Sequence, residues 1–240
     1  MKPRYSLVLL DADSTLFDFP RAEREAFGRT ADIFGLPGDD ASYALYSSIN
    51  DGYWHALGLG EITKEQLLYR RFEDFLRAVS AEGSPDEING IYRNLLGEGY
   101  YLLPGAEEVC RELSRHCRLV IATNGVDSTQ RSRLAKSPIA PYIEALISSD
   151  MAGANKPDPR FFSYLFSHIP PAEKSETLMV GDLLYSDIKG GVDSGLDTCW
   201  YNPGHLPEPA DLPVTYIIDR LENLTEIVIK GECGARPVAV

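Results

Sequence analysis

The chain has 240 residues, 44% of them hydrophobic and 25% charged, which suits one large globular domain or a core with one insertion. Its formal net charge of −13 disfavours nucleic acid and anionic membranes as partners, so an anionic substrate needs positive charge supplied locally. The four cysteines form no C-x-x-C pair, which argues against zinc and disulfide frameworks and favours reduced thiols: Cys110, Cys117, Cys199 and Cys233.

Short apolar runs predict the strands of a parallel sheet. The first run, residues 5–10, follows a basic start and stops at Asp11, which is too early for a signal peptide. No stretch approaches the length needed to span a bilayer, so we expect a cytoplasmic protein. The later strand candidates are residues 118–122, 146–147, 177–180, 198–201 and 214–218.

Helical patterns lie between these runs. They cover residues 106–115, 159–168, 188–194 and 221–230. Strands that alternate with helices predict an α/β fold with a Rossmann-like, doubly wound parallel sheet. The tail after Gly231 is expected to be loose.

Residues 21–100 differ from the rest because they contain helical patterns and no convincing strand. Within them, Thr63 and Gln66 suit a capping box at a helix start. We therefore predict an α/β core of residues 1–20 and 101–240, with an inserted all-helical cap of residues 21–100. The four expected cap helices cover residues 21–34, 43–57, 64–80 and 85–95.

Two acidic residues, Asp11 and Asp13, follow the first predicted strand. Successive side chains of an extended segment alternate, so both can lie on one side, at the strand end where open α/β sheets bind ligands. Carboxylates this close repel unless they share a cation or a proton. One can attack as a nucleophile while the other transfers protons, although a solvated acidic turn gives the same pattern.

Two further motifs carry groups suited to an anion. Thr123, Asn124 and Gly125 follow a strand, where a hydroxyl and backbone N–H groups suit a phosphate and where an ordinary turn is the alternative. Lys156 begins a loop stiffened by two prolines, which can hold an ammonium in one place. An exposed loop lysine is the alternative interpretation.

The last motif adds carboxylates at another strand end. Asp182 and Asp187 follow the strand at residues 177–180. With Asp11 they form an oxygen-rich set, which suits magnesium rather than zinc. Helix capping by Ser186 or Asp187 is the alternative.

Taken in this order, the four motifs resemble those of the haloacid dehalogenase-like hydrolase superfamily over nearly the whole chain. The helical insertion resembles the smaller, C1-type cap of that family. One departure is Ser14, where the family usually has Gly. The matching positions are Asp11 and Asp13 in the first motif, Thr123 in the second, Lys156 in the third, and Asp182 with Asp187 in the fourth.

The resemblance implies a magnesium-dependent phosphatase. Asp11 would be the nucleophile, forming an aspartyl-phosphate, and Asp13 the general acid and base. An acid at position 13 is what phosphatases of the family need and what its dehalogenases usually lack. Lys156 would add positive charge. Thr123, Asn124 and Gly125 would bind the substrate phosphate, and Mg²⁺ would be held by Asp11, the Asp13 carbonyl, Asp182 and Asp187.

A narrower resemblance concerns the pyrimidine-type 5′-nucleotidases of the superfamily, which implies a nucleoside 5′-monophosphate or another small phosphorylated metabolite as substrate. It rests on residues 13–19, Trp54, 60–63, 71–72, and 179–182 with Cys199-Trp200. Four cap aromatics are candidates for stacking on a base, although aromatics at helical spacing more often form a core: Tyr53, Trp54, His55 and Tyr100.

Three alternatives remain open at the level of sequence. A sugar-phosphate phosphatase, a pyrophosphatase or a phosphomutase would share the fold and most of the motifs. A dehalogenase is disfavoured by Asp13. A non-catalytic binding module is disfavoured because binding alone would not require Asp11, Asp13, Lys156 and Asp182 together.

Overall fold

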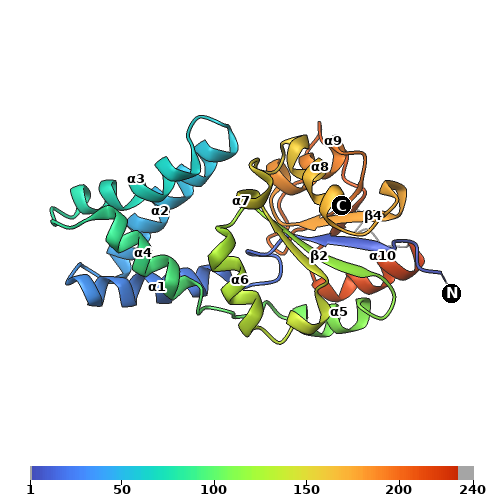
Figure 1. Ribbon diagram of the computed structural model, residues 1–240, viewed down its shortest axis with the longest axis horizontal. Coiled ribbons are helices and arrows are strands. Elements are labelled where there is room, and N and C mark those ends of the chain that lie inside the picture. The colour runs from blue at the N-terminus through green and yellow to red at the C-terminus, as the bar shows by residue number, and fades with distance from the viewer. Residues whose placement is uncertain (1, 232–240) are drawn as a thin grey trace. The chain divides into compact units, whose positions relative to one another are not determined.

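The computed structural model describes residues 2–231 and divides the chain into two compact units, each described by itself (Figure 1). An α/β unit joins the chain up to Asp18 with the chain from Leu102 onward, and a helical unit spans Phe19–Tyr101. The prediction from sequence set these boundaries at residues 20/21 and 100/101. Cys233 and the tail beyond Gly231 lie outside the described residues.

A six-stranded parallel sheet with the order β3-β2-β1-β4-β5-β6 forms the centre of the α/β unit. This confirms the predicted Rossmann-like, doubly wound sheet. The chain leaves β1 toward β2 and β3, then returns to place β4 on the other side, so the topological switch point lies between β1 and β4. The strands are β1 (Leu7–Leu10), β2 (Arg118–Thr123), β3 (Ala145–Ser148), β4 (Thr177–Gly181), β5 (Asp197–Tyr201) and β6 (Tyr216–Ile218).

Helices cover both faces of this sheet, with α5 and α10 on one side and α8 and α9 on the other (Figure 1). The α-helices of the unit are α5 (Ala106–Leu113), α6 (Asp127–Lys136), α7 (Ser149–Ala152), α8 (Pro159–His168), α9 (Lys189–Asp193) and α10 (Leu224–Lys230). Short turns are η1 (Ala140–Tyr142), η2 (Lys174–Glu176), the π-helical η3 (Leu184–Ile188) and η4 (Leu221–Asn223).

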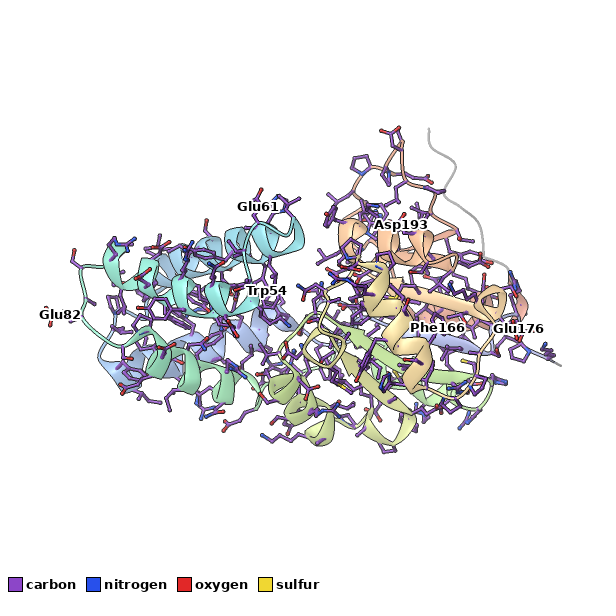
Figure 2. All side chains as sticks on the ribbon, turned by 45° about the horizontal axis from the view of Figure 1, so that its top comes forward. Trp54, Glu61, Glu82, Phe166, Glu176 and Asp193 are labelled. Carbon is purple, nitrogen blue, oxygen red and sulfur yellow. The ribbon has the colours of Figure 1, made fainter. Side chains whose placement is uncertain are left out.

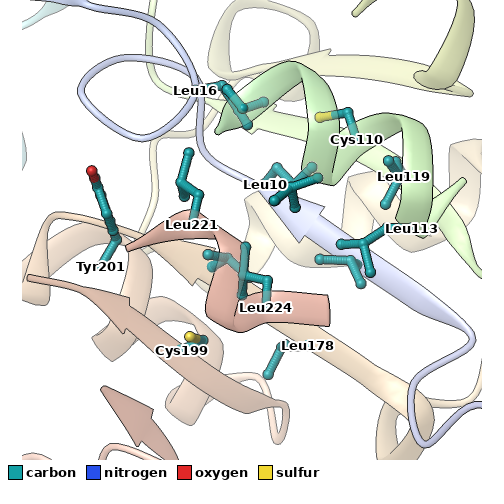
Figure 3. Close-up of a cluster of buried hydrophobic side chains, with 14 of the residues drawn as sticks. Leu10, Leu16, Cys110, Leu113, Leu119, Leu178, Cys199, Tyr201, Leu221 and Leu224 are labelled. Carbon is teal, nitrogen blue, oxygen red and sulfur yellow. The ribbon is translucent and has the colours of Figure 1, made fainter. Parts of the chain in front are cut away.

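The buried strand β1 explains why the unit needs helices on two sides. Its side chains alternate, so Val8 and Leu10 join one core cluster while Leu7 and Leu9 join the other. Figure 3 shows the first cluster, where side chains of β1, α5 and α10 meet. A strand that is apolar on both faces suits the interior of a parallel sheet, as its sequence predicted.

The helical unit contains α1 (Phe19–Phe34), α2 (Asp40–Gly58), α3 (Lys64–Ala78) and α4 (Pro85–Leu96). The predicted capping box is confirmed, because Thr63 and Gln66 exchange side chain-to-backbone hydrogen bonds at the start of α3. Among residues 2–231, no helix is both long enough and apolar enough to cross a membrane.

Stacked aromatic rings fill the core of the helical unit. Tyr46 stacks on Phe27 with ring centroids 4.9 Å apart and on Phe72 with centroids 5.1 Å apart. The four candidate base-stacking aromatics lie elsewhere. Tyr53 and Trp54 of α2 are half-buried, and His55 and Tyr100 are exposed, so none of the four belongs to this core. Trp54 is labelled in Figure 2.

A buried polar network crosses the same unit. The Glu23 carboxylate is only 2% exposed and accepts hydrogen bonds from Asn50 at 2.9 Å, Tyr43 at 3.1 Å and Ser47 at 3.2 Å. Asn50 in turn accepts a hydrogen bond from the buried guanidinium of Arg71 at 3.0 Å. Burial raises the pKa of Glu23 from 4.5 to about 6, against the opposing effect of the Tyr43 hydrogen bond.

The raised pKa of Glu23 predicts a pH-dependent difference between the wild type and a Glu23→Gln variant. The folded state holds the proton more tightly, so this stabilisation is complete below pH 4.5 and is lost as the pH rises through about 6. The free energy of unfolding of the variant, relative to wild type, should therefore rise by about 2 kcal/mol between pH 4 and pH 7. Urea denaturation of both proteins across this range measures it, and a pH-independent difference would contradict it.

Candidate active site

The loop after β1 begins within the sheet and then turns sharply. The Asp11 N–H donates to the Val180 carbonyl at 2.9 Å, which extends the β1–β4 ladder by one residue. The N–H groups of Leu16 and Phe17 both bond to the Ala12 carbonyl, so the chain folds back over itself. Ser14 lies at a φ of +59° in this turn, a left-handed conformation that favours glycine. This backbone conformation explains why glycine is usual at this position in the family's first motif.

Lys156 links three segments at the carboxyl end of the sheet. Its side chain is 1% exposed, and its Nζ donates to Asp11 Oδ1 at 2.7 Å, to Asp187 Oδ1 at 2.7 Å and to the Ala122 carbonyl at 2.5 Å. Burial alone lowers the pKa of Lys156, but the Asp11 and Asp187 carboxylates outweigh burial and raise it. The ammonium therefore stays charged, and the alternative of an exposed loop lysine is wrong.

Three carboxylates form a cluster here, and two of them, Asp11 and Asp187, bond to this ammonium. Ligand oxygens of Asp11, Asp182 and Asp187 all lie within 4.8 Å of one another. Burial, with the Asp187 charge, raises the pKa of Asp182 to about 7, and burial raises that of Asp11 well above its usual value despite Lys156. One ammonium does not balance three acids, of which Asp11 and Asp187 are buried and Asp182 is half-buried, so the oxygen-only donor set fits a hard divalent cation such as Mg²⁺.

The second motif contributes the end of β2. The Thr123 hydroxyl accepts a hydrogen bond from the Gly125 N–H at 3.0 Å, which orients it. The Asn124 side chain donates to the Lys156 carbonyl at 3.0 Å and accepts from the Lys156 N–H at 2.8 Å. The side chain of Asn124 thus positions the Lys156 loop, where the Lys156–Pro157 peptide bond is cis.

The fourth motif depends on a glycine. A Cβ atom at Gly181 would lie 2.2 Å from the Asp187 Oδ2 atom, so only glycine leaves room for this carboxylate under the end of β4. Asp187 Oδ2 also accepts the Leu183 N–H at 3.0 Å, across the π-helical turn η3. This bond to a backbone N–H resembles a helix cap. Because Asp187 also accepts a hydrogen bond from Lys156, it both caps the turn and belongs to the site.

Four residues around these motifs were not singled out as site residues from the sequence. Thr15 donates its hydroxyl to Asp182 Oδ1 at 3.1 Å, and the Trp200 indole N–H donates to the Asp182 carbonyl at 2.9 Å. Gln130 and Arg133 of α6 both donate to the Asp13 carboxylate. A polar residue two positions from Asp13 was a possible signal for Thr15, and Trp200 was noted only as part of the narrower resemblance. Nothing local marks Gln130 or Arg133.

Known proteins that are similar to this chain include hydrolases. A model of the haloacid dehalogenase-like hydrolase family matches residues 5–195. HAD-hydrolase YfnB of Bacillus subtilis is 36% identical over 94% of this chain and 96% of its own length. Its magnesium-bound crystal structure has a TM-score of 0.88, with 93% of this chain and 98% of that chain covered.

Two further relatives are pyrimidine 5′-nucleotidases. PynA of Streptococcus pneumoniae is 32% identical, with 95% of this chain and 96% of that protein covered. YjjG of Escherichia coli is 29% identical, with 95% and 99% covered. The parallel sheet with acids at its carboxyl edge places the chain in the Rossmann-like α/β class. The chain belongs to the haloacid dehalogenase-like hydrolase family, and within it the chain is an enzyme of the phosphatase class.

The left-handed backbone at Ser14 predicts that Ser14→Gly stabilises the α/β unit. A residue with a Cβ pays about 1–2 kcal/mol in this conformation, and the greater chain entropy of glycine offsets part of the gain. We expect the free energy of unfolding to rise by roughly 0.5–1 kcal/mol. Urea denaturation measures the change, and a less stable variant would show that the serine makes a compensating contact.

The close approach at Gly181 predicts that Gly181→Ala displaces Asp187 and, through it, Lys156. Displacements near 1 Å at a reacting centre cost about 100-fold in rate, so hydrolysis of p-nitrophenyl phosphate should fall by roughly that factor. Gly52→Ala is the matched control, because a Cβ there meets open space. Equal activity of the two variants would mean that Asp187 can move without consequence.

Proposed function

We propose that this protein is a Mg²⁺-dependent phosphomonoesterase that acts through an aspartyl-phosphate on Asp11. The observation that carries the proposal is the buried contact of Lys156 with Asp11 inside the three-carboxylate cluster. A carboxylate that is held by an ammonium at a strand end, beside oxygen ligands for a cation, is suited to attack an anionic phosphate. Asp13, two residues further on, is suited to proton transfer.

In the proposed reaction, an Asp11 oxygen bonds to phosphorus as the bond from phosphorus to the ester oxygen breaks. Asp13 gives its proton to that leaving oxygen, so an alcohol departs. Water then attacks the aspartyl-phosphate and loses a proton to Asp13, which releases phosphate and restores Asp11 and Asp13. Mg²⁺, when held by Asp11, the Asp13 carbonyl and Asp182 with support from Asp187, would neutralise charge and orient the phosphate.

The remaining groups bind the phosphate without changing covalently. The Thr123 hydroxyl and the backbone amides of Asn124 and Gly125 would hold phosphoryl oxygens, and Lys156 would offset the charge that gathers on them. Preorganised groups of this kind supply most of the rate of phosphoryl transfer. We also propose that the helical unit, Phe19–Tyr101, is a C1-type cap that selects the substrate.

Pyrimidine nucleoside 5′-monophosphates are the first candidates for the substrate. Two relatives aligned over almost the entire chain are named for this activity. Both are about 30% identical, a level at which the reaction class is more safely transferred than the substrate. Small sugar phosphates, pyrophosphate and phosphomutase substrates therefore belong in the same test.

The proposal predicts phosphate release from a panel of nucleoside monophosphates and sugar phosphates with Mg²⁺ and none with EDTA. Asp11→Asn should lower the rate by at least about 1,000-fold, because the nucleophile is lost. Asp32→Asn, an exposed acid on α1, is the matched control and should keep full activity. Preference for pyrimidine monophosphates supports the nucleotidase assignment.

Other outcomes change the proposal in defined ways. Phosphate release from sugar phosphates alone would be consistent with the mechanism and would assign a sugar phosphate as the substrate. Full turnover by Asp11→Asn, or by the wild type in EDTA, would contradict the mechanism itself. Halide release from a 2-haloacid with no phosphate release from any ester would place the chain among dehalogenases.

A further inference from the structure

We propose that Gln130 and Arg133 of α6 are positioning residues for Asp13, which they hold in place by both carboxyl oxygens. The inference rests on the proposed function, because it concerns the group that would protonate the leaving alcohol. A proton donor on a short loop side chain must point at one ester oxygen and then at one water molecule. Something rigid must therefore fix its direction.

The contacts are complementary. Arg133 Nη1 donates to Asp13 Oδ1, and Gln130 Nε2 donates to Asp13 Oδ2 at 2.5 Å. Arg133 Nη1 also lies 3.4 Å from Gln130 Oε1, so the two donors contact each other as well as the acid. Gln130 and Arg133 are three positions apart on α6 and therefore share one face of the helix.

Burial makes this pair of donors rigid. The Arg133 side chain is fully buried and Gln130 is 2% exposed, whereas the Asp13 side chain is 28% exposed. The Arg133 guanidinium also lies 4.5 Å from the centroid of the Phe17 ring, in the same loop as Asp13. Each carboxyl oxygen can accept a second hydrogen bond, so the exposed side of Asp13 remains able to reach a reacting oxygen.

The phosphate-binding motif makes room for this arrangement. A Cβ atom at Gly125 would lie 2.2 Å from Gln130 Nε2, so glycine is required for Gln130 to reach Asp13. Helix α6 starts two residues after Gly125, at Asp127. The segment that would bind the phosphate and the helix that orients the acid are therefore one continuous piece of chain, which sets the proton donor relative to the phosphorus.

A buried ion pair that only supports the fold would leave the same geometry, so the test separates the two roles by leaving group. The nitrophenolate of p-nitrophenyl phosphate departs readily without a proton, whereas an alkoxide needs one. The ratio kcat/KM includes steps only up to release of the leaving group, so the later hydrolysis of the phosphoenzyme does not affect it. The alkyl substrate is the ester that the wild type hydrolyses fastest in the panel above.

We expect Arg133→Met and Gln130→Met to lower kcat/KM for the alkyl ester by roughly 10–100-fold, and that for p-nitrophenyl phosphate by less than about threefold. With p-nitrophenyl phosphate, both variants should show a burst of nitrophenolate. Asp13 would also take the proton of the hydrolytic water, so hydrolysis of the phosphoenzyme should become slower than its formation. In an Asp13→Asn background, Arg133→Met should not lower kcat/KM for the alkyl ester any further, because the effects of substitutions in residues that act as a unit are not additive. Arg133→Lys should restore part of the loss.

Arg131→Met is the matched control, because Arg131 lies on the same helix, is half exposed and pairs with Asp127. Thermal unfolding of each variant shows whether the fold survives, and Gln130→Met keeps the test open if Arg133→Met does not fold. Equal losses for both esters, or a gain for the alkyl ester, would overturn the positioning role while the phosphatase stands. A wild type that hydrolyses no ester overturns the proposed function and this inference together.

Discussion

The arrangement of side chains at the carboxyl end of the sheet depends on the hydrogen bonds of one buried ammonium, that of Lys156. It joins Asp11 after β1, the carbonyl of Ala122 in β2 and Asp187 beyond β4. A charge this deep is tolerable only with well-placed partners, so the three segments are constrained to meet. Asn124 hydrogen-bonds to the Lys156 backbone, and Gly181 leaves space for the Asp187 side chain. Both residues therefore help to hold the Lys156 ammonium and its partners in place.

The sheet order explains why so few residues suffice. Because β1 lies between β2 and β4, the loops that follow these three strands emerge side by side, next to the switch point. Each loop then needs only one or two special residues to complete the site. The same geometry places Asp13 beside α6, so the proposed acid comes from the loop after β1 and its two donors come from the helix after the neighbouring strand β2.

Much of the fold was predictable because its signals are local. All six strands follow from short apolar runs, and the four helices of the inserted unit follow from periodicity and caps such as the Thr63–Gln66 box. The short turn η3 was missed, because a π-helical turn has no periodic signal of its own. In the helical unit the core aromatics were also missed, since spacing alone does not distinguish Tyr46, which is buried, from Trp54, which is half-buried.

The sequence by itself determined which chemical groups stand at the ends of the strands, because a motif and its strand are neighbours along the chain. Only the tertiary structure decided which of them touch. Gln130 meets Asp13 across 117 positions, and Thr15 meets Asp182 across 167, distances at which no periodicity or spacing carries information. Such contacts depend on how the sheet orders its strands and buries its helices, and that order is a property of the folded chain.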